Sequence, residues 1–177
     1  MLLLIHPDRP WPRETLERIW DYVRRGGALL VAADTAVRSG DAKSSFNEVL
    51  EPLSMRVCFD SAVARTANWE QAYQLASHPA SFGLNDLRNP FGMLMGSSLR
   101  AGWATRPILA GRWGWSEPGG SAVAGFSGYN AGERLGDLLL AAEQPFGRGR
   151  VAVLGETTPL HNETLAAGYP FVGRLLC

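Results

Sequence analysis

Residues 2–34 read LLLIHPDRPWPRETLERIWDYVRRGGALLVAAD, and this stretch decides the fold that the sequence predicts. Its two ends, residues 2–7 and 28–34, are short apolar runs of the length expected for buried strands. The segment between them has apolar residues at intervals of three and four, which places them on one face of a helix. These apolar residues are Leu16, Ile19, Trp20 and Val23.

The ends of this predicted helix carry the expected boundary residues. Pro12 suits the first turn, and Gly26 with Gly27 supplies a left-handed stop after residue 25. The links to the flanking strands are short, and a strand–helix–strand unit of this kind has parallel strands. The first fifth of the chain therefore predicts an α/β fold.

The remaining chain extends this pattern less regularly. We expect a short helix over residues 44–54, one or two strands over 55–64, and strands within 93–102 and 106–115. A hairpin over 137–144 and 150–156 and a helix over 162–177 follow. The sequence predicts one domain over residues 1–177, a three-layer α/β fold. Its mainly parallel sheet carries helices on both faces, and the middle region adds an antiparallel hairpin or side sheet.

Composition excludes several classes of protein. The chain has 177 residues, of which 46% are hydrophobic and 19% charged, an ordinary balance for a globular domain. Seventeen basic and 17 acidic residues give a net charge of zero, which argues against a nucleic-acid-binding protein. No apolar run reaches the length of a membrane span, and the N-terminus lacks a signal peptide. We expect a soluble chain and leave its compartment open.

The usual signatures of an enzyme or a cofactor site are incomplete. GFSGY at 125–129 resembles the nucleophile elbow around Ser127, but its last glycine is missing and a poor helix start follows. GRGRVA at 147–152 precedes a strand, whereas a dinucleotide fingerprint follows one, so it predicts a turn. Neither the histidines nor the cysteines have metal-ligand spacing. We therefore expect no catalytic residue, no metal and no cofactor.

Polar residues gather where two predicted strands end. Asp34 and Glu156 each end an apolar run, and His161 and Asn162 lie in the same loop as Glu156. In a parallel sheet both strand ends face the carboxyl edge, where ligands bind. One interpretation is that the acidic side chains only cap backbone N–H groups. The other is a small-molecule or hydrolase site, acting on a carbohydrate for example, with Glu156 or His161 as general base.

Two further features have a structural interpretation. His78 in SHPAS is expected to stabilise a turn. Trp113 and Trp115 are spaced by two, which places both on one side of a strand, where core packing is favoured over sugar stacking.

The segment 2–34, with NEVLEPLSMRVCFD at 47–60 and GRGRVAVLGETTPLHN at 147–162, resembles a set of uncharacterised bacterial domains. These domains have the class I glutamine-amidotransferase-like, flavodoxin-like fold and occur in auxiliary proteins of gliding-motility-type ABC transport systems. SHPASFGL at 77–84 resembles a turn of the same domains. Glu156 stands where these domains usually carry Asp, and Asn162 matches their Asn.

The resemblance implies a binding or interaction module without amidotransferase machinery. It implies a place in a larger bacterial protein, associated with the envelope or the extracytoplasmic side. It also implies truncation at one or both ends, because such domains have another strand–helix unit before residue 2 and a longer last helix. We expect a protein partner or another segment to cover the resulting sheet edge, since exposed edge strands tend to pair.

Overall fold

A computed structural model describes residues 1–6, 10–34, 45–65, 73–84, 93–118, 128–168 and 170–176. The strands are β1 Leu2–Ile5, β2 Ala28–Ala32, β3 Met55–Val57, β4 Asp60–Ala64, β5 Tyr73–Leu75, β6 Leu99–Ala101, β7 Arg106–Pro118, β8 Leu135–Phe146 and β9 Gly149–Leu154. The α-helices are α1 Arg13–Arg24, α2 Ser45–Val49, α3 Asn162–Ala166 and α4 Pro170–Leu176, and a 3-10 turn, η2, spans Thr158–Leu160.

The β1–α1–β2 unit forms as the sequence predicts. β1 and β2 pair in parallel, with Leu2 opposite Leu29 and Ile5 opposite Ala32. Helix α1 buries the predicted apolar stripe and ends at Arg24. Gly26, which follows its C-cap, has a φ of +116°, a conformation that glycine adopts at little cost. The local pattern was sufficient here because the contacts within this unit are close in sequence.

The predicted C-terminal hairpin is also confirmed. β8 and β9 pair antiparallel around a turn at Gly147, whose φ is +64°. β9 then lies parallel to β2, with Ala28 opposite Arg150 and Ala32 opposite Leu154. The C-terminal hairpin thus joins the N-terminal unit in one sheet.

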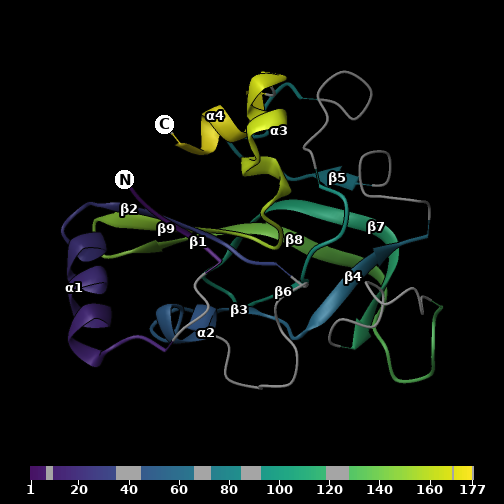
Figure 1. The fold of residues 1–177 in the computed structure, drawn as a ribbon, viewed down its shortest axis with the longest axis horizontal. Coiled ribbons are helices and arrows are strands. Elements are labelled where there is room, and N and C mark those ends of the chain that lie inside the picture. The colour runs from purple at the N-terminus through teal and green to yellow at the C-terminus, as the bar shows by residue number, and fades with distance from the viewer. Residues whose placement is uncertain are drawn as a thin grey trace.

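The rest of the sheet branches around the two longest strands. β9 pairs with one end of β8, and β6 pairs with β8 at Leu139. β7 also pairs with β8, while β4 and β5 pair with β7. β3 lies beside β6. In Figure 1 the sheet curls, and β4 crosses at the end opposite α1.

The predicted fold class is wrong: the sheet is not mainly parallel, and the molecule is not a three-layer flavodoxin-like fold. Among the described pairs, only β1–β2 and β2–β9 are parallel. A parallel pair needs a crossover, usually a helix, and the described residues between 55 and 154 contain no helix. The described strands of this region pair antiparallel, and together with the two parallel pairs they form a curled, mixed sheet.

Helices cover two faces of this sheet. Helices α1 and α2 pack on one apolar cluster that includes Trp20, Phe46 and Val153. Helix α4 packs on the other cluster through Phe171, Val172 and Leu175, and Figure 1 shows α3 and α4 on the side of the sheet away from α2. The predicted single C-terminal helix is broken in two, because Gly168 adopts a φ of +71° and α4 starts afresh at Pro170.

Candidate functional site

The parallel ends of β2 and β9 bring together most of the polar residues that the sequence singled out. Asp34 and Thr157 meet there, and Thr157 Oγ1 donates a hydrogen bond of 2.7 Å to Asp34 Oδ2. His161 Nε2 lies 3.5 Å from the same hydroxyl. The hydroxyl of Thr157 therefore stands between a carboxylate and an imidazole, and its proton is directed to Asp34.

Glu156 lies directly before this group and is buried. Thr158 Oγ1 donates to Glu156 Oε1 at 2.6 Å, and the backbone N–H of Leu94 donates to Oε2 at 2.8 Å. Burial raises the pKa of the Glu156 carboxyl, and the nearby Asp34 carboxylate adds to this rise. Hydrogen bonds from Thr158 and from the backbone of Met95 and Leu94 partly oppose it. Both carboxylate oxygens of Glu156 already accept hydrogen bonds from the protein, and these bonds link η2 to the segment 93–98.

Asn162 stands apart from the other predicted site residues. It is the first residue of α3 and its side chain is exposed, as is that of His161. At this edge the Thr157 hydroxyl can accept a long hydrogen bond from His161 Nε2, while the acidic groups bond to protein atoms. The small-molecule or hydrolase site at Asp34, Glu156 and His161 stays a prediction.

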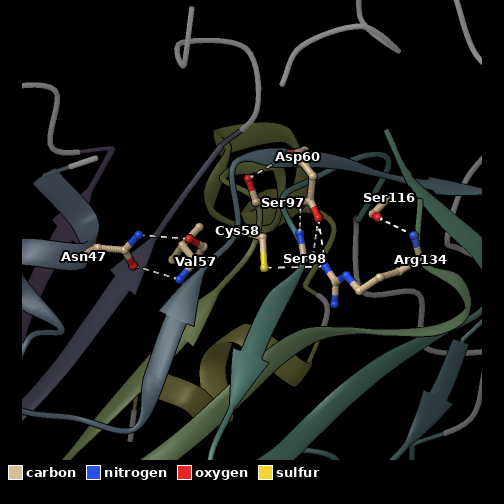
Figure 2. Close-up of polar contacts among 8 residues, drawn as sticks. All are labelled: Asn47, Val57, Cys58, Asp60, Ser97, Ser98, Ser116 and Arg134. Atoms are coloured by element: carbon tan, nitrogen blue, oxygen red, sulfur yellow. Dashed lines mark hydrogen bonds and ion pairs between the residues drawn. The ribbon is translucent and has the colours of Figure 1, made fainter. Parts of the chain in front are cut away.

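A second polar cluster, which sequence reasoning missed, joins three distant segments (Figure 2). Asp60 begins β4, and its Oδ1 accepts a 2.8 Å hydrogen bond from the backbone N–H of Ser98. Asp60 Oδ2 accepts hydrogen bonds from Ser98 Oγ at 2.5 Å and from Arg134 Nη2 at 2.9 Å. Both carboxylate oxygens are therefore occupied.

Arg134 holds this cluster against the start of β8. Its Nη2 also contacts Ser98 Oγ, and it lies 3.5 Å from the sulfur of Cys58. The backbone N–H of Arg134 donates to Ser116 Oγ at 3.0 Å, which ties the loop before β8 to β7. Asp60 and Arg134 are 74 residues apart in sequence. No local pattern could have paired them, since each is an ordinary charged residue at a strand boundary.

This cluster forms one wall of a cavity of about 770 Å³. The end of β7 and the loop before β8 also line it. Glu117 is among the lining residues and is buried, with only 2% of the residue exposed. Its Oε1 accepts hydrogen bonds from Trp115 Nε1 at 3.0 Å and from the backbone N–H of Gly128 at 2.9 Å.

His78 has the turn role that its sequence context indicates. Its Nδ1 accepts a 3.1 Å hydrogen bond from the backbone N–H of Ala80, and its Nε2 lies 3.5 Å from Glu143 Oε1. Both residues are buried. Ser127, in the stretch that resembles a nucleophile elbow, lies outside the described residues.

Neither a metal-binding cluster nor a membrane-spanning helix is found in the described part of the chain. It holds no group of three or more His, Cys, Asp or Glu side chains placed to bind a metal ion. No helix found there is both long enough and apolar enough to cross a bilayer.

Comparison with known proteins relates this chain to others through its fold. No family model and no curated protein matches it. The N-terminal domain of IFT52 is similar to it at a TM-score of 0.64 with 16% identity, over 98% of this chain and 73% of that chain. The cytoplasmic protein STM3548 from Salmonella typhimurium is similar at a TM-score of 0.56 with 16% identity, over 98% and 68% of the two chains.

A segment of the cold-adapted β-galactosidase from Rahnella sp. R3 is also similar. Its TM-score is 0.52 with 14% identity, over 98% of this chain and 22% of the enzyme. These likenesses, together with the mixed and curled sheet, overturn the resemblance to glutamine-amidotransferase-like, flavodoxin-like domains. The segment 2–34 resembles those domains because β1–α1–β2 is a local unit that different sheets can contain.

Proposed function

We propose that this chain is a protein-binding module that accepts an extended segment of a partner along β1. The observation that carries the proposal is the edge position of β1. It pairs with β2 on one side, and no strand of the described residues pairs with it on the other. An unpaired edge offers backbone donors and acceptors that a partner strand can use.

Some backbone N–H and C=O groups of β1 point away from β2, where a partner strand could reach them. His6 N donates to Ala32 O at 2.9 Å, so the N–H of His6 faces β2. Because these directions alternate along a strand, the N–H and C=O groups of Leu3 and Ile5 face away from β2. A partner strand would form its hydrogen bonds with these two residues.

The side chains beside this edge are apolar and accessible. Met1 is 53% exposed, Leu3 38% and Ile5 51%. Leu3 and Ile5 pair with Leu30 and Ala32, whose side chains belong to the cluster under α4, so they project from the same face of the sheet. A strand with apolar residues at alternate positions would bury this face while it pairs with β1.

A site-specific photo-crosslinker tests this proposal in the cells that produce the protein. It is placed at Ile5, or as a control at Leu165, which is 46% exposed on α3. We expect a discrete protein adduct from position 5 and not from position 165. Leu3→Pro should abolish the adduct, because it removes an outward N–H but no hydrogen bond to β2.

The thermal midpoint of Leu3→Pro shows whether the fold is retained. Equal adducts from the two positions, or an adduct that survives in folded Leu3→Pro, would contradict the proposal. An adduct within the same polypeptide would show that the edge is covered internally, which also contradicts binding of a separate partner.

A further inference from the structure

Exposed arginines surround the end of the sheet where β8 turns into β9. They are Arg24, Arg25, Arg106, Arg148 and Arg150, and we call them the turn arginines. In Figure 1 the end of α1 that leads into β2, the start of β9 and the N-terminus lie on the same side of the molecule. The turn arginines therefore lie near the amino end of β1.

Backbone contacts hold the β8–β9 turn against the end of α1. The N–H of Arg148 donates to Arg24 O at 2.9 Å, and Arg150 stands opposite Ala28, the first residue of β2. The guanidinium of Arg24 lies over the ring of Phe146, 4.9 Å from its centre. These contacts bring together arginines that lie more than a hundred positions apart in the chain.

Two of the turn arginines flank a buried carboxylate on the face that α4 covers. Glu143 stands opposite Arg106 in the β7–β8 ladder, so their side chains project from the same face. Glu143 Oε2 lies 3.8 Å from Arg150 Nε, and its Oε1 lies 3.5 Å from His78 Nε2. Because Glu143 is only 8% exposed, it offers little of its negative charge to a molecule at the surface.

Positive charge exceeds negative charge at this end of the sheet. Arg25 pairs with Asp21 at 2.6 Å, and Arg150 pairs with Glu143. The other three turn arginines form no ion pair with any residue that the structure describes. The whole chain has a net charge of zero, so this excess is local, and it favours an anionic partner.

The position of the turn arginines favours an acidic protein segment. β1 and β2 both start at this end, with Leu2 opposite Leu29 and Ala28 opposite Arg150. A strand that binds along β1 and continues past its amino end would therefore approach the turn arginines. A nucleic acid is less suited, because proteins that bind it usually carry an excess of basic residues overall.

We infer that the partner segment carries a short acidic run beside the residues that pair with β1, and that the turn arginines bind this run. The inference rests on the proposed pairing along β1. Carboxylates of the run accept hydrogen bonds from the guanidinium groups, while the apolar residues of the same segment cover Leu3 and Ile5. A strand antiparallel to β1 carries the acidic run after its apolar residues, and a parallel strand carries it before them.

Fluorescence anisotropy with labelled synthetic peptides tests the inference. One peptide has alternating valines and threonines followed by four glutamates, another has the glutamates first, and each has a counterpart with glutamines in place of the glutamates. We expect one acidic peptide to bind about tenfold more tightly than its glutamine counterpart at low salt, the combined effect of several exposed ion pairs. The difference should shrink in about 0.5 M NaCl, which screens such pairs.

Arg24→Gln combined with Arg148→Gln should remove most of this difference and leave binding of the glutamine peptide unchanged. The matched control is Arg18→Gln combined with Arg112→Gln, which changes the net charge equally at exposed positions. Arg18 bonds to Glu14 in the first half of α1, and Arg112 lies at the β7–β8 bulge, so neither belongs to the turn arginines. Circular dichroism checks that both double variants fold.

The outcomes separate this inference from the proposed pairing at β1. Equal binding of the acidic and glutamine peptides, or a difference that the Arg24 and Arg148 double variant retains, would overturn the inference but not the pairing. An acidic peptide that binds Leu3→Pro as tightly as the unmodified chain would contradict the pairing, and with it the inference.

Two further results would also overturn the inference. One is no binding of any peptide, in which case the photo-crosslinking experiment alone decides the pairing at β1. The other is tighter binding of a DNA duplex or of phosphatidylserine vesicles that the same double variant abolishes, because the turn arginines would then bind a different class of polyanion.

Discussion

Glu156 is a buried carboxyl group whose protonation is linked to folding. Burial raises the pKa of this carboxyl above its usual value of 4.5, so the folded chain holds its proton more tightly than the unfolded chain. The stabilisation from this proton is complete below pH 4.5 and is lost as the pH rises through the folded-state pKa. Above the folded-state pKa the ionised carboxylate is therefore a cost to the folded state.

Glu156→Gln should remove this pH dependence. The amide oxygen can still accept from Leu94 N, and the amide nitrogen can donate to Thr158 Oγ1, so both contacts are kept. We expect the variant to be at least as stable as the unmodified chain at pH 7. Its free energy of unfolding should fall less as the pH rises, measured by denaturant titration at a series of pH values.

The matched control is Glu163→Gln, at an exposed position in α3. Its pH profile should follow that of the unmodified chain. A Glu156→Gln profile parallel to the unmodified one would show that this carboxyl does not titrate differently in the folded state.

The sequence predicted the residues at the shared end of β2 and β9 better than the hydrogen bonds that these residues form. Asp34, Glu156 and His161 do reach one edge, because β2 and β9 are parallel and both end there. The contact of Leu94 with Glu156 was not predictable, since 62 residues separate them. The cluster of Asp60, Ser98 and Arg134 was missed for the same reason.

At the scale of the element, the end of β9 is packed against the segment before β6 too closely for a side chain. A Cβ on Gly155 would lie 2.1 Å from the carbonyl oxygen of Ser97. Gly155 also donates to Leu140 O and accepts from Ser97 N, so three segments converge on it. Gly155→Ala should lower the free energy of unfolding by about 1–3 kcal/mol, the usual cost of overpacking.

Gly173→Ala is the opposite case and the control. A Cβ on Gly173 meets nothing within 4 Å, and the residue lies inside α4. Alanine should stabilise this helix by about 0.5–1 kcal/mol. Denaturant midpoints of the two variants measure both effects, and a loss of stability in Gly173→Ala or none in Gly155→Ala would contradict this account.

Strands with irregular register limit what a sequence can predict. Trp113 and Trp115 were expected on one side of a strand, but the β7–β8 register shifts between Gly111 and Gly114. Trp113 has a φ of +56° and is 64% exposed, while Trp115 is half-buried and donates to Glu117. The alternation of side chains fails at a bulge, and no residue pattern marked this one.

At the scale of the whole molecule, helix α4 covers one face of the sheet through a few side chains. Phe171 is fully buried in the cluster that also contains Leu30 and Leu140. Phe171→Ala should lower the free energy of unfolding by about 3–5 kcal/mol, as for other buried phenylalanines. Phe82→Ala is the control, because Phe82 is 82% exposed, and it should change stability by less than about 0.5 kcal/mol.

Calorimetry of both variants measures the difference. Similar thermal midpoints would mean that α4 contributes little to the core, contrary to the burial of Phe171.

The fold as a whole was harder to predict than its parts. The β1–α1–β2 unit and the β8–β9 hairpin were both predicted, since each is held by contacts that are close in sequence. The arrangement of these two units in one sheet was not predicted. The sequence of residues 55–118 lacks the alternation of strand and helix patterns that marks a crossover connection. Whether a chain forms a parallel or a mixed sheet depends on such connections, and the predicted helices covered only the two ends of the chain.

The pairing of β2 with β9 also governs the order in which the chain can fold. The two strands are about 120 residues apart, so their contact has a high contact order and forms slowly. During synthesis, β2 emerges long before β9 and has a free edge until residues 149–154 leave the ribosome. Throughout that interval the apolar β1–β2 pair is open to premature association, which makes the nascent chain a candidate for chaperone dependence.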